Sequence, residues 1–248
     1  AEGTAGLGNR LAERQSAEAR ETLAEARAEV ERQRPLSFSL PPTGLPAARD
    51  VLTVDGLTIR LPGGREIGPV SFSIRGPERV AISGPNGAGK TTILSAVAAA
   101  GAGAEGDVRL SRAAPPVLDQ HLSLLDDRRT VLENMQRHQP SLSDNTVYAT
   151  LARFAFRNAE ADRRVGTLSG GGRLRAALAC IFASDPPPEL LILDEPTNHL
   201  DLASIEELES ALVAHDGAIL VVSHDHGFLE RIGVGTHLRL PLLPGRSA

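Results

Sequence analysis

The sequence predicts an α/β fold with a parallel core sheet, and three observations carry this prediction. The runs 190–193 (LLIL) and 218–222 (AILVV) are continuously apolar, which is typical of parallel strands buried on both faces. A short strand at 80–83 leads directly into a glycine-rich loop. The segments 91–100 and 121–185 have mostly helical patterns, so strands and helices alternate along the chain.

Three further segments complete the expected sheets. Residues 51–60 and 68–75 alternate apolar and polar side chains, which predicts a pair of antiparallel strands beside the parallel core. Val117–Leu118 looks like a short strand at a sheet edge. The sequence therefore predicts a mixed fold, with a parallel core, an antiparallel β subdomain and a helical subdomain.

Composition bounds the classes of function that need to be considered. The chain has 248 residues, 41% of them hydrophobic, which is enough for one sizeable core with or without an appendage. A net charge of -5 gives no overall attraction to nucleic acid or to an anionic membrane. The sequence contains no apolar run of about 18 residues, no signal-peptide core and a single cysteine. We therefore expect a soluble, cytoplasmic protein without a membrane span.

The N-terminal part differs from the rest. Residues 10–34 lack glycine and proline and consist mainly of good helix formers, and Pro35 ends the expected helix. The helix is either an exposed charged helix or one half of a helical hairpin. Alternating steps of four and three residues form a weak heptad seam of Ala12, Ser16, Ala19, Leu23, Ala26 and Val30. We favour the hairpin because so polar a helix has little to bury by itself. The expected organisation is a helical linker segment (1–34), a proline-rich connector (35–49), a folded domain (50–241) and a tail (242–248).

The most specific motif is the loop 84–91, GPNGAGKT, which fits the pattern G-x-x-x-x-G-K-[ST] between a strand and a helix. Its glycines allow backbone N–H groups to point at phosphates, and the next helix adds its positive end. Lys90 is the only lysine among 26 basic residues, as expected where a compact charge must reach the β- and γ-phosphates. The expected nucleotide-binding residues of this region are Gly84, Pro85, Asn86, Gly87, Ala88, Gly89, Lys90, Thr91 and Thr92.

A pair of acidic residues ends the apolar run 190–193. Asp194 and Glu195 then lie at the carboxyl edge of the sheet, where open α/β sheets bind their ligands. We expect Asp194 to hold Mg²⁺ together with the Thr91 hydroxyl, and Glu195 to activate a water molecule as general base. These motifs predict a P-loop nucleoside triphosphatase that uses Mg²⁺, and ATP as the nucleotide is implied only by the family resemblance described next.

A second glycine-rich loop narrows the class of P-loop nucleoside triphosphatase to which the sequence can belong. Residues 168–171, LSGG, resemble the signature loop of ABC ATPases. The resemblance implies a P-loop ABC nucleotide-binding domain, here preceded by the charged N-terminal helix. It also implies that Ser169, Gly170 and Gly171 contact the γ-phosphate held by a second cassette, which is either part of the same parent chain or another copy of this one. Such a domain is an ATPase that produces ADP and phosphate.

The order of the remaining motifs also matches that superfamily over residues 50–240. Gln120 resembles the Q-loop glutamine, Leu200-Asp201 resembles the D-loop, and His224 resembles the switch histidine. The resemblance implies that Gln120 contacts Mg²⁺ and water and that His224 contacts the γ-phosphate. The expected catalytic residues are Glu195, His224 and Gln120, and the expected metal ligands are Thr91, Gln120 and Asp194. His121, His199, His215 and His226 are expected to be structural or solvated.

The run 195–201, EPTNHLD, and the segment 173–179 resemble the ABC-F branch of this family. Members of that branch carry two cassettes joined by a helical hairpin, have no membrane part and act on ribosomes. The resemblance implies a ribosomal partner (the 50S subunit and its rRNA), contacted through the linker and the domain surface, and antibiotic resistance by ribosomal protection.

Two positions depart from the family pattern, and two other functions remain as alternatives. Gly172 stands where the family usually has Gln or Glu, which predicts a less stable start of the helix. The stretch 57–67 has no aromatic residue to stack on adenine, so an aliphatic side chain or Arg60 is the expected substitute. The main alternative is the motor subunit of a drug-exporting ABC transporter, docking membrane helices near Gln120. A structural cassette that does not hydrolyse ATP is less favoured because Glu195 and His224 are intact.

Overall fold

The computed structural model describes residues 40–112 and 114–240. The predictions made for the N-terminal helix, for the first part of the connector and for the tail lie outside the described residues. The chain divides into two compact units, Ala1–Leu36 and Ser37–Ala248, and all the elements below belong to the second unit. Among the described residues, no helix combines the length and the apolar character needed to cross a lipid bilayer.

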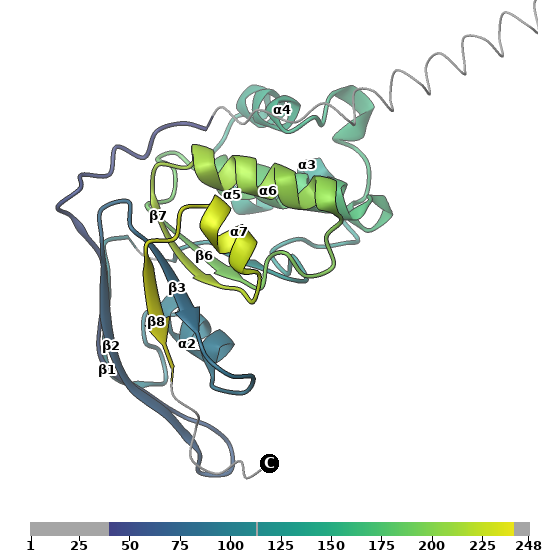
Figure 1. Ribbon diagram of the computed structural model, residues 1–248. Helices are drawn as coiled ribbons and strands as arrows, with labels where there is room; N and C mark the ends of the chain where they lie inside the picture. The colour runs from purple at the N-terminus through teal and green to yellow at the C-terminus, as the bar shows by residue number, and fades with distance from the viewer. Residues whose placement is uncertain (1–39, 113, 241–248) are drawn as a thin grey trace, which may run out of the picture. The chain divides into compact units, whose positions relative to one another are not determined.

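A five-stranded parallel sheet forms the centre of the fold (Figure 1). Its strand order is β5-β6-β7-β3-β8, and every neighbouring pair is parallel. The strands are β3 (Arg79–Ser83), β5 (Val117–Asp119), β6 (Leu190–Asp194), β7 (Ala218–Val222) and β8 (Thr236–Arg239). The predicted parallel core is therefore confirmed, and β5 lies at an edge of the sheet as expected.

The strands β6 and β7 are buried on both faces, which explains their continuous apolar sequence. Along β6, Leu191 and Leu193 belong to one hydrophobic cluster, whereas Leu190 and Ile192 belong to another on the opposite face. The first cluster packs the helices against the sheet, and the second packs α2 and the antiparallel strands against it. Two cores therefore hold the sheet from both sides.

The antiparallel sheet has the order β2-β1-β4, with β1 at Asp50–Arg60, β2 at Glu66–Arg75 and β4 at Glu105–Leu110. The predicted pair β1 and β2 is confirmed. The strands β4 (EGDVRL) and β8 (THLR) were not predicted, because both are short, polar and largely exposed. In Figure 1 the antiparallel strands stand on one side of the parallel sheet and the large helices on the other.

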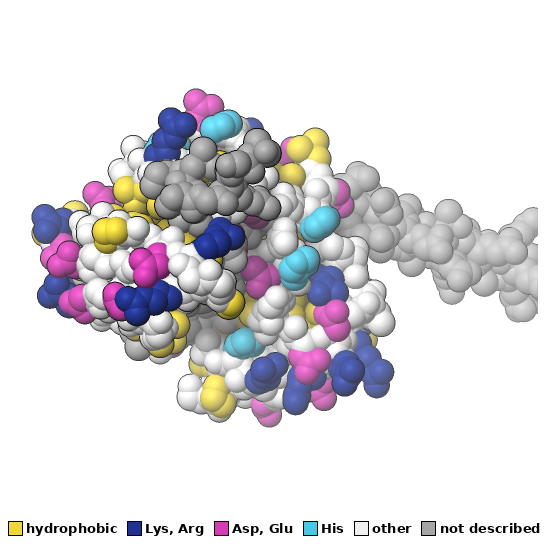
Figure 2. Space-filling model, turned by 90° about the horizontal axis from the view of Figure 1, so that it is seen from below, with side chains coloured by type: hydrophobic (Ala, Val, Ile, Leu, Met, Phe, Trp, Pro, Cys, Tyr) yellow, Lys and Arg dark blue, Asp and Glu magenta, His cyan; other side chains and the backbone are white. Residues whose placement is uncertain are grey.

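The helices are α2 (Lys90–Ala98), α3 (Val131–His138), α4 (Asp144–Arg153), α5 (Gly170–Phe182), α6 (Leu202–Ala214) and α7 (His226–Arg231). The helical prediction for 121–185 holds for α3, α4 and α5. Between α4 and α5 the chain forms turns and two 3₁₀ segments, Asn158–Glu160 and Val165–Thr167, instead of a continuous helix. On the face shown in Figure 2, basic and acidic side chains are mixed and do not form large patches of one sign.

The described part of the proline-rich connector packs on the domain. The Thr43 amide donates to Asp216 Oδ1 at 2.9 Å, and the Gly76 amide donates to the Arg49 carbonyl at 2.7 Å. Leu40 and Leu45 pack against the two hydrophobic clusters. Residues 40–49 are therefore anchored to the domain by hydrogen bonds and by apolar contacts.

His215, at the C-terminal end of α6, is a buried histidine whose charge state affects stability. Its side chain is 1% exposed, its ring lies 5.4 Å from the ring of Phe182, and its Nε2 atom has no hydrogen-bond partner among the described residues. Burial lowers the pKa of His215 to about 4, and nearby Arg79 lowers this pKa further in opposition to Asp216. The folded protein therefore holds this ring neutral.

Because the pKa of His215 is lower in the folded chain than in the unfolded chain, its contribution to stability is complete above about pH 6.5 and falls as the pH drops towards 4. We expect the free energy of unfolding to fall by about 2 kcal/mol between about pH 7.5 and about pH 5 because of this one group. Urea unfolding at the two pH values measures it. His215→Leu should remove this part of the pH dependence, and an equal dependence in the variant and the original protein would contradict the assignment.

Candidate functional site

The predicted site residues follow four neighbouring strands of the parallel sheet. Since all four strands run in the same direction, their carboxyl ends meet at one edge. The P-loop follows β3, Gln120 follows β5, Asp194 ends β6, and His224 lies two residues after β7. In the register of the sheet, Asp194 is paired with Asp119 on one side and with Val222 on the other. The fold therefore brings these motifs together.

The P-loop closes around the ammonium group of Lys90. Three glycines of the loop, Gly84, Gly87 and Gly89, have positive φ angles of 151°, 79° and 88°, which other residues rarely adopt. The Lys90 Nζ atom donates to the Gly84 carbonyl at 2.9 Å and to the Pro85 carbonyl at 3.3 Å. Lys90 is also the first residue of α2, so a positive side chain and the positive end of a helix coincide.

The antiparallel sheet packs directly on the P-loop through an aliphatic side chain. A Cβ atom at Gly89 would lie 2.4 Å from Ile67 Cδ1, so a side chain at position 89 would require Ile67 to move and would also strain the positive φ angle there. Arg60 instead pairs on the exposed hairpin with Glu66 at 3.0 Å and with Glu105 at 2.8 Å. Ile67 therefore lies buried against the P-loop, and Arg60 is held by acidic neighbours.

Asp194 has the character of a cation ligand. Its Oδ1 atom is buried and has no hydrogen-bond partner among the described residues. Within those residues, no group of three or more His, Cys, Asp or Glu side chains could hold a metal ion by itself. The oxygen ligands predicted here, Thr91, Gln120 and Asp194, are the type that Mg²⁺ prefers, and Mg²⁺ commonly takes its other ligands from phosphates and water. The residues present therefore fit Mg²⁺ bound together with a phosphate group.

Glu195 and His224 are in direct contact. The Glu195 backbone has a φ angle of 46°, and its amide donates to the Val222 carbonyl at 2.8 Å. This left-handed conformation is uncommon outside glycine and turns the side chain towards the end of β7. Glu195 Oε1 lies 3.3 Å from His224 Nε2, and Glu195 Oε2 accepts from the His224 amide at 3.2 Å. The carboxylate is therefore fixed from two directions, and it is 17% exposed whereas His224 is 60% exposed.

The signature loop begins α5. Ser169 is the N-cap residue, and its hydroxyl accepts from the Gly172 amide at 3.2 Å, so the first turn is closed although residue 172 is a glycine. Gly170 has open space where a side chain would start, which leaves room for a ligand. Among the described residues, no hydrogen bond joins 168–172 to the P-loop.

The signature loop does contact the D-loop region. A Cβ atom at Gly171 would lie 2.8 Å from Ser204 Oγ, so the two segments pack without a side chain between them. Asp201 is the N-cap residue of α6 and accepts from the Ser204 amide at 2.8 Å. Hydrogen bonds from the Ser204 side chain and amide lower the pKa of Asp201. The signature loop and the start of α6 therefore form one packed unit.

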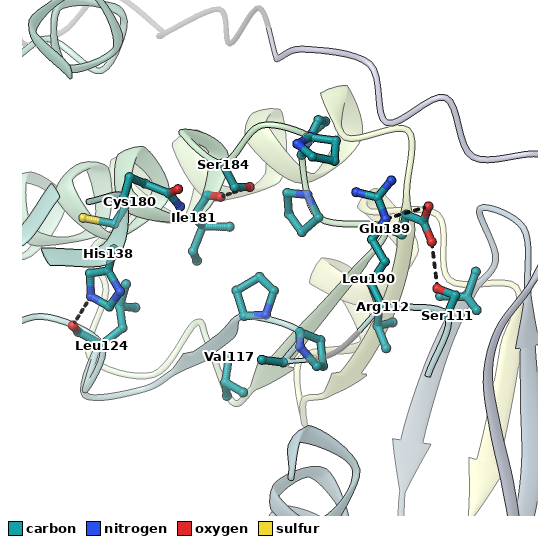
Figure 3. Close-up of a pocket in the computed structure, with 18 of the residues that line it drawn as sticks. Ser111, Arg112, Val117, Leu124, His138, Cys180, Ile181, Ser184, Glu189 and Leu190 are labelled. Carbon is teal, nitrogen blue, oxygen red and sulfur yellow. Dashed lines mark hydrogen bonds and ion pairs between the residues drawn. The ribbon is translucent and has the colours of Figure 1, made fainter. Parts of the chain in front are cut away.

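A cavity of about 720 Å³ lies beside β5 and α5, away from the P-loop (Figure 3). Prolines line much of it, and its buried carboxylate, Glu189, pairs with Arg112 at 3.1 Å and accepts from Ser111 Oγ at 2.7 Å. Burial raises the pKa of Cys180, which also lines the cavity, to about 12, so this thiol is unreactive at neutral pH. None of the predicted site residues lines this cavity.

The buried Oδ1 atom of Asp194, which has no hydrogen-bond partner among the described residues, leads to a testable prediction. A variant at the neighbouring Asp119 serves as its control. In the chain without nucleotide, Asp194→Asn removes the charge of a half-buried carboxylate whose buried Oδ1 atom has no hydrogen-bond partner among the described residues, so we expect the free energy of unfolding to rise by about 1 kcal/mol. Asp119, the paired residue on β5, accepts from the amides of His121 and Ser123 at 2.8 and 3.1 Å, so Asp119→Ala, which removes this acceptor, should destabilise. Urea unfolding without Mg²⁺ measures both. Destabilisation by Asp194→Asn would contradict the assignment of Asp194 as a cation ligand.

Comparison with known proteins assigns the family. Residues 67–198 match the family model described as "ABC transporter". The chain is 34% identical to "ABC transporter F family member 2" of Arabidopsis thaliana over 79% of this chain and 29% of that protein. It is 34% identical to "Energy-dependent translational throttle protein EttA" of Haemophilus influenzae (79% and 36%) and 36% identical to "Tylosin resistance ATP-binding protein TlrC" of Streptomyces fradiae (80% and 34%). The chain thus spans about a third of the length of these relatives.

A solved structure agrees on the fold. A protein described as "a putative metal-chelate type ABC transporter" in an inward-facing conformation superposes with a TM-score of 0.63 over 77% of this chain and 80% of that chain, at 21% identity. The predicted fold class is therefore confirmed, and the curated relatives do not favour the transporter alternative. The chain belongs to the ABC transporter family as an ATP-binding ATPase domain, with relatives among the ABC-F proteins.

Proposed function

We propose that this domain binds Mg-ATP at the carboxyl edge of its parallel sheet and hydrolyses it when a second cassette closes over the nucleotide. The observation that carries this proposal is the meeting of the P-loop, Asp194, Glu195 and His224 at one edge. The open space at Gly170, in the first turn of α5, supports a role of the signature loop towards a nucleotide held by a second cassette.

The binding step uses the P-loop. The backbone N–H groups of residues 86–92 hold the phosphates, and the Lys90 ammonium exchanges the carbonyls of Gly84 and Pro85 for β- and γ-phosphate oxygens. Thr91, Asp194 and Gln120 hold Mg²⁺, which neutralises part of the charge on the phosphate oxygens when it is bound. Ser169, Gly170 and Gly171 present a hydroxyl and helix N-terminal amides to the γ-phosphate of the partner cassette.

The chemical step uses the contact between Glu195 and His224. Glu195 takes a proton from the attacking water as general base, and the contacts with the His224 amide and ring hold its carboxylate in place. His224 is more exposed than Glu195, so its ring is accessible to the γ-phosphate. The resulting work is conformational, because hydrolysis removes the phosphate that joins the two cassettes.

Removal of the general base tests this assignment. Glu195→Gln keeps the shape of the side chain but cannot accept the proton, so we expect the rate of phosphate release to fall at least about 100-fold while ATP remains bound. Phosphate release and nucleotide retention are measured over a range of protein concentrations, because two cassettes must meet. Glu206→Gln, at an exposed position of α6, is the matched control and should leave both unchanged. Unaltered turnover in Glu195→Gln would rule out Glu195 as the base.

We further propose that the parent protein is an ABC-F protein that acts on the ribosome and protects it against antibiotics. The run 195–201 (EPTNHLD) supports this proposal. The printed names of two relatives, a translational throttle protein and a tylosin resistance protein, support the link to translation and to resistance. The ribosome contact is assigned to the linker and the domain surface, and a cytoplasmic location follows from such a partner.

Co-sedimentation with 70S ribosomes tests the ribosomal role. The parent chain carrying Glu195→Gln should pellet with ribosomes in ATP and stay in solution in ADP, because only ATP holds the closed form. Adding Lys90→Ala to the same chain is the control, since loss of the phosphate contact should abolish pelleting in ATP. Failure of the parent chain to pellet in ATP would overturn the ribosomal proposal and leave the ATPase assignment intact.

A further inference from the structure

The side-chain amide of Gln120 is held at both of its ends. The Asn198 Nδ2 atom donates to Gln120 Oε1 at 3.2 Å, and the Gln120 Nε2 atom lies 3.1 Å from His121 Nε2. An amide nitrogen can donate but cannot accept, so the donation from Asn198 fixes which end of Gln120 carries the oxygen. The oxygen faces the loop that follows β6, and the nitrogen faces His121.

Two backbone features bring Asn198 to Gln120 although 78 positions separate them. Glu195 and His199 both have positive φ angles, 46° and 65°, and the Asn198 amide donates to the Glu195 carbonyl at 3.2 Å. These turns fold the segment after β6 back along the sheet edge. On the neighbouring strand, Asp119 Oδ1 accepts from the His121 amide at 2.8 Å, which fixes the start of the loop that carries Gln120.

A second contact joins the same two loops. The rings of His121 and His199 are stacked, with their centroids 6.4 Å apart and their planes 20° apart. Two adjacent contacts therefore join the loop after β5 to the loop after β6: one between Gln120 and Asn198, and one between His121 and His199. His199 directly precedes the D-loop residues Leu200 and Asp201, and Asp201 is the N-cap residue of α6. These contacts therefore join the loop that carries Gln120 to the D-loop.

We propose that Asn198 is a positioning residue for Gln120. It orients the Gln120 amide so that Oε1, whose second lone pair is free, faces the Mg²⁺ site beside Asp194. The stacked pair of His121 and His199 supports this arrangement. This inference rests on the proposed role of Gln120 as a Mg²⁺ ligand. It gives a function to the Asn-His pair of the run EPTNHLD, to which the proposed mechanism assigns none.

The inference makes Asn198 act only through Gln120, and a double-mutant cycle tests this directly. The quantity measured is the ratio of the dissociation constants of a fluorescent ATP analogue in EDTA and in Mg²⁺. Gln120→Leu should lower this ratio. Asn198→Leu, which keeps the size but removes the donor, should lower it about threefold to tenfold, the usual effect of one hydrogen bond. The double variant should match Gln120→Leu alone, and Asn145→Leu on the exposed face of α4 should have no effect.

The possible outcomes distinguish the role of Gln120 as a Mg²⁺ ligand from the role of Asn198 as its positioning residue. An unchanged ratio in Gln120→Leu would overturn the role of Gln120 in the proposed function, and the inference with it. A lower ratio in Gln120→Leu together with an unchanged ratio in Asn198→Leu would overturn the inference alone. Losses that add in the double variant would also overturn it, because Asn198 would then act on another group.

A readout without metal or nucleotide tests the contact itself. The chain has five glutamines, at positions 15, 33, 120, 136 and 139, so ¹⁵N labelling of glutamine gives few side-chain amide signals. Gln120→Leu assigns the signal of Gln120 by its loss. Asn198→Leu should shift the Gln120 signal and leave the other four in place. A Gln120 signal that does not move would show that Asn198 does not hold it, and this result would contradict the inference.

Discussion

The common direction of the five core strands is the constraint on which the site depends. Because β3, β5, β6 and β7 are parallel, the loops after them open at the same edge, and residues more than a hundred positions apart become neighbours there. The strand β6 is central to this arrangement, since its apolar residues are buried by one core on each face. A change that shifted β6 by one residue would exchange its two faces and would also move Asp194 and Glu195 away from their partners.

Two side chains of opposite charge, Lys90 and Asp194, lie at the start of α2, where the P-loop ends, and at the end of β6. Lys90 donates to carbonyls of its own loop, which are weaker partners for an ammonium group than phosphate oxygens are. Asp194 Oδ1 is buried without any donor among the described residues. In the proposed function, Mg-ATP supplies an anion to the first group and a cation to the second, so one ligand satisfies both. Glu195, by contrast, is already held by His224, which agrees with a residue that acts on water and not on the metal.

The sequence predicted the parallel core because burial on both faces requires continuous apolar runs, and it predicted the P-loop because few residue types allow that backbone. The polar strands β4 and β8 were missed, since their positions depend on neighbouring strands and not on their own pattern. The contacts between His121 and His199 and between Gln120 and Asn198 could not be predicted either. They depend on the turns at Glu195 and His199, where residues other than glycine adopt positive φ angles. His215 was expected to be structural or solvated, and the structure shows that it is buried.

The central claim is that the carboxyl edge of the parallel sheet is the place where ATP binds. A crystal structure of the Glu195→Gln chain with ATP and Mg²⁺ tests this most directly, because this change should block turnover and preserve binding. We expect phosphates against the amides of residues 86–92, with Lys90 Nζ turned from the Gly84 carbonyl to phosphate oxygens and the metal ion beside Thr91 and Asp194. Nucleotide bound elsewhere, for example in the proline-lined cavity beside β5, with the P-loop unchanged, would contradict it.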